Sequence, residues 1–231
     1  MPSLNAYLAG ITALLISLTG YITAYNSIKR GKRDNHPLLI MVGLLLAGMG
    51  SLYTGTNASF ISLLITNQNL PKNLVGQLCY FWAPITITIG VYVGMNVIKQ
   101  SLAKKFTIVY ALTIPFYLYG LIFDAENTIG SAIPEEIGGG LIDINLLSYI
   151  KLITAIYLVS TLIVLGIGFL LLGIKSAGAV RRKGFLLAAG YILFVVCGAI
   201  DSLVDFSAFI VIVRFFMMSA YVLLYRGFTE I

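Results

Sequence analysis

The chain is 231 residues long, and 59% of its residues are hydrophobic while only 10% are charged. With a mean hydropathy of +0.95, this composition excludes a sizeable separate soluble domain and favours a protein embedded in a membrane. The net charge of +6 does not indicate nucleic-acid binding, because the cations lie in short loops beside apolar stretches, where they favour attraction to anionic lipid.

Seven apolar stretches predict seven transmembrane helices. Each is near the 20 or so residues that a helix needs to cross about 30 Å of hydrocarbon. The connections contain no low-complexity tract or linker, so we predict an all-α membrane protein with one domain, a seven-transmembrane-helix bundle over residues 1–231. The predicted spans cover residues 4–28, 38–60, 74–98, 106–123, 146–174, 184–204 and 207–225.

The charges predict how these spans are oriented. Twelve of the 15 Lys and Arg residues lie in segments 29–36, 99–105 and 175–183 or at Arg226, while most of the acids lie in the other connections. Cations near span ends stay cytoplasmic, so we place the amino terminus outside and the carboxyl terminus in the cytoplasm of a cell membrane. The first span has no cation before it and four directly after it, and we expect an uncleaved anchor.

Polar residues recur along the first span. Asn5, Thr12, Thr19 and Asn26 are spaced seven residues apart, with Thr23 beside them, which places them along one side of a helix. We expect this side to face protein, where it serves either interhelical hydrogen bonding or a path for a ligand or an ion.

Two prolines lie within later spans. Each lacks a backbone N–H, so Pro84 in the third span and Pro115 in the fourth are expected to free a carbonyl and bend the helix. Gln77, Trp82 and Tyr117 lie near them, which places polar and aromatic groups in the outer half of the bundle.

The longest connection is the outer segment 124–145, which is acidic and rich in glycine. A connection of this length is typical of a lid or a binding loop. The alternative is a solvated spacer whose glycines let the chain turn back into the membrane.

Ionisable residues inside the spans predict specific pairs. Asp201 and Asp205 are four residues apart, so both can reach Arg214 across the turn into the last span. A charge at membrane depth costs about 2.5–3.5 kcal/mol and needs a partner. We therefore predict pairing of these aspartates with Arg214, and of Lys151 with Asp143 or the outer loop. The pairing is either a clasp between two spans or the wall of an outward-opening pocket.

Several enzyme classes and cofactors are not expected. The only histidine, His36, lies in a basic loop, so a histidine-based zinc site or paired haem ligands cannot form. The sequence has no catalytic triad, phosphate loop or Cys-x-x-Cys motif. Cys79 and Cys197 lie inside spans and are interpreted as buried hydrophobes. We predict a non-enzyme without a metal or other cofactor.

The layout resembles that of the microbial rhodopsins, and Trp82-Ala-Pro84-Ile-Thr86 is similar in content to their third helix. That family binds retinal through a lysine in the middle of the seventh span. Here that region reads Val211-Ile-Val-Arg-Phe-Phe-Met-Met-Ser-Ala220, and Arg214 cannot form the imine. A covalent light sensor is therefore not expected.

The chain also resembles the seven-helix sensor modules that precede kinase domains in archaea and bacteria. The similarity lies in Arg181-Arg-Lys-Gly184 before the sixth span, Asp201-Ser-Leu203 after it, and Arg214. The resemblance implies a prokaryotic receptor-like protein that senses a ligand or the membrane state. We expect a cytoplasmic or membrane protein partner to carry its signal.

Three functions are consistent with the sequence. The preferred one is a receptor-like or sensor protein with an outward-facing polar pocket for an unknown small ligand. The alternatives are a small-solute transporter, which the polar residues of the first span favour, and an accessory subunit that uses an apolar face such as Phe215-Phe-Met-Met218. The candidate ligand-binding residues are Gln77, Trp82, Tyr117, Lys151, Asp201, Asp205 and Arg214.

Overall fold

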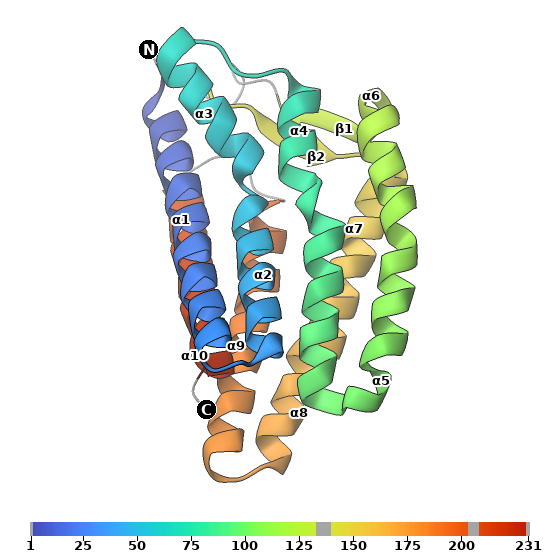
Figure 1. The fold of residues 1–231 in the computed structure, drawn as a ribbon. Coiled ribbons are helices and arrows are strands. Elements are labelled where there is room, and N and C mark those ends of the chain that lie inside the picture. Colours follow the sequence, from blue (N-terminus) through green and yellow to red (C-terminus); the bar gives the residue numbers. More distant parts are fainter. Residues whose placement is uncertain (1, 133–139, 203–207, 230–231) are drawn as a thin grey trace.

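The computed structural model describes residues 2–132, 140–202 and 208–229, and nearly all of them are helical (Figure 1). The helices form an elongated bundle whose amino and carboxyl termini lie at opposite ends. In chain order the elements are α1 (Leu4–Arg33), α2 (Pro37–Ser51), α3 (Thr54–Thr66), α4 (Lys72–Tyr80), α5 (Trp82–Phe123), α6 (Ala125–Thr128), β1 (Ile129–Ala132), β2 (Asp143–Leu146), α7 (Ser148–Thr161), the π-helix η1 (Leu162–Ile167), α8 (Gly168–Lys175), α9 (Gly178–Asp201) and α10 (Ala208–Thr229).

Several of these helices are compatible with a multi-pass membrane protein. Within the described residues, five helical stretches are long and apolar enough to cross a membrane, or six if the bent pair α2 and α3 is one span. The stretches are Leu4–Arg33, Lys72–Phe123, Ser148–Lys175, Gly178–Asp201 and Phe209–Thr229. The fold is therefore all-α apart from a small two-stranded hairpin.

The helix α5 consists of two arms. Its backbone is not helical at Lys99, where φ is −157° and ψ is 88°. In Figure 1 the ribbon runs from α4 down the first arm, turns at the end of the bundle, and returns along the second arm to α6. Residues 99–105, predicted as a loop between two spans, thus contain the reversal, although the helix resumes directly after Lys99.

Two other breaks interrupt helices in the half of the bundle that holds the amino terminus (Figure 1). The pair α2 and α3 bends by 43° at Leu52 and Tyr53. Between α4 and α5 the helix is interrupted at Phe81. Pro84 explains this interruption, because it has no N–H to donate to the carbonyl of Tyr80, four residues earlier. Phe81 keeps helical backbone angles (φ −53°, ψ −39°), so the structure shows an interruption near Pro84, and the bend predicted there stays a prediction.

The first helix buries a different side from the one expected. Thr12 and Thr23 are buried, but Asn5 and Asn26 are exposed and Thr19 is half-buried. The hydroxyl groups of Thr12, Thr19 and Thr23 all donate to carbonyls of α1 itself. The expectation that the whole polar series faces protein was therefore wrong.

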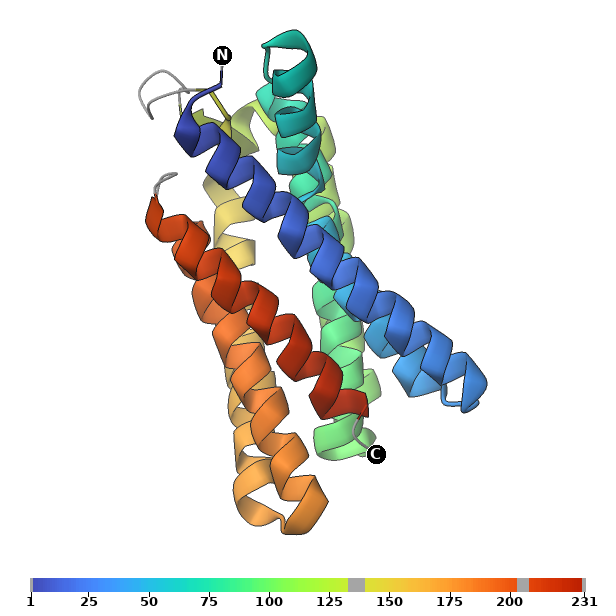
Figure 2. The ribbon, with the colours of Figure 1, turned by 90° about the vertical axis from the view of Figure 1, so that its left-hand side faces the viewer.

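Small side chains decide which side of α1 packs. Ala6, Ala13, Gly20 and Ser27 are buried and lie one residue after each member of the polar series. Figure 2 shows α1 running beside α10, and α2 also packs against it. A Cβ atom on Gly20 would lie only 2.9 Å from the Cα atom of Gly50 in α2. Helix backbones that approach this closely require small residues. The side of α1 with the small residues is therefore buried in place of the polar side.

A hairpin covers the end of the bundle near α3 and α4 (Figure 1). Its antiparallel strands β1 and β2 pair Ile129 with Leu146 and Ala132 with Asp143. Ile129 and Ile142 are buried, and Ile142 packs with Val75 and Cys79 of α4. The described parts of the predicted 124–145 segment therefore pack against the bundle and are more than a solvated spacer.

The packing of α1 predicts different effects for two adjacent substitutions. Gly20→Val places methyl groups against backbone atoms of α2 that cannot move aside, and should destabilise the protein by about 1–3 kcal/mol. Thr19→Val, on the half-buried neighbour, should change stability little. Thermal unfolding of the purified protein in detergent measures both. Equal losses for the two variants would contradict the assignment of the packed side.

Candidate functional site

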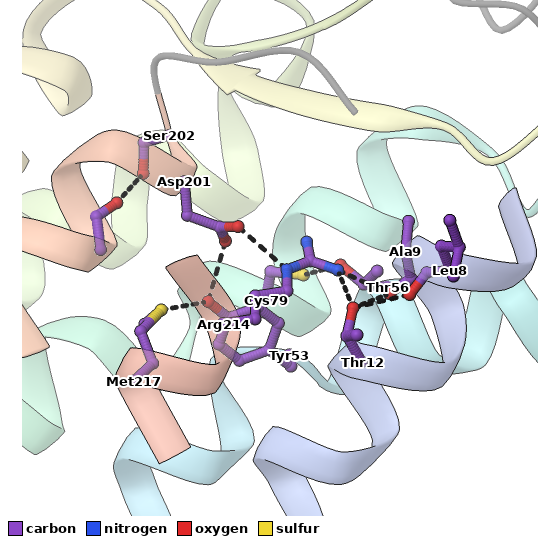
Figure 3. Close-up of polar contacts among 11 residues, drawn as sticks. Leu8, Ala9, Thr12, Tyr53, Thr56, Cys79, Asp201, Ser202, Arg214 and Met217 are labelled. Carbon is purple, nitrogen blue, oxygen red and sulfur yellow. Dashed lines mark hydrogen bonds and ion pairs between the residues drawn. The ribbon is translucent and has the colours of Figure 1, made fainter. Parts of the chain in front are cut away.

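Arg214 is the largest fully buried side chain in the described part of the protein. It lies just under two turns into α10 and is 2% exposed. Its Nε donates to Oδ1 of Asp201, at the end of α9, over 2.9 Å (Figure 3). The predicted Asp201–Arg214 pair is thus confirmed, whereas Asp205 lies outside the described residues.

A second guanidinium nitrogen joins Arg214 to the first helix. Nη1 donates to the carbonyl of Ala9 at 2.5 Å and to the hydroxyl oxygen of Thr12 at 3.1 Å. The Thr12 hydroxyl in turn donates to the carbonyl of Leu8 at 2.7 Å. Figure 3 shows these groups meeting between α1 and α10. Arg214 therefore joins α10 to both α9 and α1, whereas the sequence suggested a clasp between two neighbouring spans only.

Tyr53 completes this group from the bend between α2 and α3. Its ring lies against the guanidinium, with 5.5 Å from the Arg214 Cζ to the ring centroid. Its hydroxyl donates to Oδ2 of Asp201 at 2.8 Å and lies 3.2 Å from the sulfur of Met217. Both oxygens of Asp201 therefore accept a hydrogen bond. We call Thr12, Tyr53, Asp201 and Arg214 the Arg214 cluster.

A cavity of about 190 Å³ lies next to the Arg214 cluster, in the centre of the bundle. Its walls come from α2, α3, α4, α5, β2, α7, η1, α9 and α10, and most of its surface is apolar. The pocket expected from the sequence was polar, so the observed cavity differs in character. Its polar and ionisable lining residues are Tyr53, Thr56, Cys79, Tyr80, Thr86, Asp143, Thr154, Thr161, Tyr191, Asp201, Ser202 and Arg214.

Of the seven candidate residues from the sequence, Asp201 and Arg214 line this cavity. Gln77 donates from Nε2 to the carbonyl of Leu121 in the second arm of α5. Trp82 is 39% exposed and packs edge-on against Phe81. Neither belongs to the cavity lining, because their positions on α4 and α5 turn them away from it.

Tyr117 and Lys151 also lie away from the lining. Tyr117 is buried between the second arm of α5 and α7, where it stacks on Tyr157, and its hydroxyl lies 3.3 Å from that of Thr154. Lys151 is exposed, and within the described residues it forms no ion pair with Asp143. Because Lys151 lies near the start of α7, its ammonium can extend to the end of the bundle instead.

Three important lining residues were not candidates. Tyr53 and Tyr80 reach the cavity because the helices break beside them, and Asp143 reaches it because β2 folds over the bundle. The only signals in the sequence were Pro84 and the polar residues near the end of the predicted span 38–60, such as Tyr53, Thr54 and Thr56. Neither indicates which side chain turns inward.

The hairpin forms the outer cover of the cavity, to which it contributes Asp143 and Ile144. Asn69, in the connection from α3 to α4, holds it in place: its side-chain N–H donates to the carbonyl of Gly140, and its Oδ1 accepts from the N–H of Ile142 at 3.2 Å. Of the two interpretations of segment 124–145, these contacts favour a lid over a spacer.

A second attachment lies at the base of the hairpin. The Asn73 amide donates to the carboxylate of Glu126, and Nζ of Lys72 lies 3.3 Å from it. Both groups lower the pKa of Glu126, and the hydrogen bond from Asn73 has the larger effect. This exposed attachment is therefore present at neutral pH and weakens as the pH falls through that lowered pKa.

The described residues contain no group of three or more His, Cys, Asp or Glu side chains arranged to hold a metal ion. Cys79 and Cys197 are both buried and free. Cys79 lies on the cavity wall, with its sulfur 3.7 Å from the Thr56 hydroxyl.

No protein-family model matches the chain, and no curated protein matches it in sequence. Its class is therefore defined by architecture: an α-helical protein whose described residues include five or six helices apolar enough to cross a membrane, built around a partly enclosed central cavity.

The Arg214 cluster makes a prediction about stability. Arg214→Leu leaves the Asp201 carboxylate buried without its cation and should cost about 3–5 kcal/mol. Adding Asp201→Leu removes the second charge and should restore much of the loss. Thermal unfolding in detergent measures the effect, with Lys151→Leu as the exposed control. If Arg214→Leu alone were as stable as the native protein, the cluster would not hold the helices together.

The hairpin makes a second prediction. Asn69→Leu removes the hydrogen bonds to Gly140 and Ile142, so the cover should open more often and Cys79 should react several-fold faster with methyl methanethiosulfonate. The measurement uses mass spectrometry in a Cys197→Ala background. Asn127→Leu is the control, since the Asn127 side chain bonds only within its own turn, to Asp124. An unchanged rate for Asn69→Leu would show that the hairpin does not limit access.

Proposed function

We propose that this chain is a seven-span membrane receptor or sensor that binds a small molecule in the central cavity and signals through a protein partner. The count of seven takes the two arms of α5 as separate spans and the bent pair α2 and α3 as one. With this count the passes alternate in direction, and the basic segments 29–36, 99–105 and 175–183 fall at the same end as the carboxyl terminus. By the distribution of cations, that end is cytoplasmic.

The observation that carries the proposal is a cavity that is closed toward the basic end. Tyr191 lines the cavity, and Phe169 stacks on it with 5.6 Å between ring centroids. Phe228, near the carboxyl terminus, packs edge-on against Phe169 at 6.2 Å. Buried Leu187 and Leu224 belong to the same cluster. A ligand bound in the cavity thus meets packed apolar side chains below it.

This closure favours a sensor over a transporter. A polar path through the bundle would need groups that replace water around the solute, and the side chains that pack below Tyr191, including Phe169, Leu187 and Leu224, are apolar. The polar series of α1, which had favoured transport, forms no continuous path, because Asn5 and Asn26 are exposed and the hydroxyls of Thr12, Thr19 and Thr23 donate to carbonyls of α1. The described lining also includes only three strongly ionisable residues, and two of them pair with each other, which supports a non-catalytic role.

The π-helix provides a route from the cavity to the cytoplasmic end. Leu165 of η1 is fully buried and lines the cavity, and π-helical turns are frequent at functional sites. η1 continues into α8, whose Gly173 touches Gly184 of α9 so closely that a Cβ on Gly184 would lie 2.6 Å from the Gly173 Cα. A ligand that displaces Leu165 therefore shifts α8 against α9 beside the basic segment 175–183. A protein partner bound at this segment would detect the shift.

A cavity-filling variant tests this proposal. Gly198 lines the cavity, and a Cβ there would meet only the Cε of Met217, at 3.9 Å. Gly198→Leu should therefore fold as stably as the native protein but lose the thermal stabilisation given by small-molecule ligands, which reaches about 2.7 kcal/mol at 100 times Kd. Val196→Leu, at a 43% exposed position of the same helix, is the matched control.

The screen uses a small-molecule library on purified protein, followed by flux measurements on every stabilising compound in sealed vesicles. Stabilisation of the native protein and of Val196→Leu, but not of Gly198→Leu, with no flux, is the expected result. Equal stabilisation of Gly198→Leu would remove the cavity as the binding site. Flux that depends on the protein would contradict the receptor function and show that the protein is a transporter.

A further inference from the structure

Tyr191, on the wall of the central cavity, has a buried hydroxyl group that lacks a hydrogen-bond partner. The side chain is 5% exposed, and its oxygen forms no hydrogen bond within the described residues. Buried polar groups in proteins are normally satisfied, because an unmade hydrogen bond destabilises the fold. The Tyr191 hydroxyl therefore needs a partner from outside the chain.

The neighbours of Tyr191 fix the position of this hydroxyl. Phe169 stacks on the ring with 5.6 Å between the centroids and 25° between the ring planes, and Phe228 packs edge-on against Phe169 from the other end. A phenol oxygen lies on the axis of its ring, so a flip of the ring does not move it. The hydroxyl is thus held ready for one partner and cannot turn to another.

The space beside the hydroxyl is apolar. A Cβ on Gly90 would lie 3.5 Å from the Tyr191 oxygen and 3.2 Å from Cδ1 of Leu45, and both residues line the cavity. A water molecule needs two to four polar partners, which these surroundings do not offer. A carbonyl oxygen has no proton to place, so one hydrogen bond donated by Tyr191 satisfies it.

The charged groups of the described lining already have partners. Nε of Arg214 donates to one oxygen of Asp201 at 2.9 Å, and the Tyr53 hydroxyl donates to the other at 2.8 Å. Asp143 is not without a partner either. A charged molecule would give up its water without gaining a free counter-charge, which is costly in an apolar cavity. The wall therefore favours a neutral molecule.

The rest of the wall suits an apolar ring. Apolar side chains from α2, α5, η1 and α9 line the cavity, among them Met49, Ile87, Leu165 and Phe194. At about 190 Å³ the cavity is somewhat larger than an engineered cavity of about 150 Å³ that binds benzene. It therefore has room for a molecule built on a single ring.

We infer that the cavity binds a small neutral carbonyl compound, whose oxygen accepts a hydrogen bond from the Tyr191 hydroxyl beside Gly90 and whose one-ring apolar body lies against Ile87 and Leu165. The inference rests on the proposed function, since it assumes that the central cavity is the ligand site.

Four probes of similar size separate the carbonyl group from charge. Cyclohexanone carries the oxygen, methylenecyclohexane replaces it with carbon, and cyclohexylammonium and cyclohexanecarboxylate carry a positive and a negative charge. Thermal stabilisation of the purified protein as a function of probe concentration gives each apparent Kd. All variants are measured in the same detergent, so partitioning of a probe into micelles cancels when two variants are compared. Each charged probe should bind at least about tenfold more weakly than cyclohexanone.

Tyr191→Phe tests the hydrogen bond, because it removes only the hydroxyl. Since that hydroxyl is unsatisfied, the variant should fold at least as stably as the native protein. It should bind cyclohexanone about fivefold more weakly and methylenecyclohexane with unchanged affinity.

Thr86→Val is the matched control. Thr86 is 4% exposed and its hydroxyl is also unpartnered within the described residues. That oxygen faces α2, however, where it occupies the space that a Cβ of Gly48 would take, and Gly48 does not line the cavity. Thr86→Val should therefore bind cyclohexanone with native affinity. Equal binding of cyclohexanone to Tyr191→Phe and the native protein would overturn the inference. So would a charged probe that binds the native protein as tightly as cyclohexanone, and this comparison needs no variant.

The outcomes also separate this inference from the proposed function. If none of the four probes binds but other compounds stabilise the native protein and not Gly198→Leu, the carbonyl compound is wrong and the receptor stands. If cyclohexanone binds the native protein and Gly198→Leu equally, the cavity is not the site and both fall. If no compound of any class binds, both fall as well.

Discussion

A guanidinium group buried among apolar helices must have its donors satisfied by the protein, and Arg214 uses them to fix the positions of several helices. Its partner Asp201 holds the end of α9, the Ala9 carbonyl and Thr12 hold α1, and Tyr53 brings in the bend between α2 and α3. Removing one partner would leave another buried polar group unsatisfied. The arrangement of these helices around the cavity therefore depends on the Arg214 cluster.

The cavity lies where regular helices are interrupted. The bend at Leu52 and Tyr53, the break at Phe81 and the π-helix η1 all lie at or next to residues of its wall. At the opposite end of the bundle the helices pack closely, as Gly173 and Gly184 show by their backbone contact. The same chain thus combines a half that encloses the central cavity, covered by the hairpin, with a half in which α8 and α9 pack backbone against backbone.

The charges on the cavity wall come from two parts of the chain. The pair Asp201 and Arg214 joins α9 to α10, and Asp143 belongs to the hairpin. The sequence had left a clasp and a pocket wall as alternatives for Asp201 and Arg214. In the structure they are both, because the buried cluster forms one wall of the cavity.

The sequence by itself determined the apolar helices, the placement of charges at their ends and the Asp201–Arg214 pair, since consecutive helices bring residues 13 positions apart together and the cost of a buried charge demands a partner. Only the tertiary structure decided which side of α1 packs, because close backbone approach selects the small residues at Gly20 and its neighbours. It also decided the contacts of Tyr53 with Asp201, 148 residues apart, and of Thr12 with Arg214, 202 residues apart. Contacts this distant depend on how all the helices pack, which no local pattern specifies.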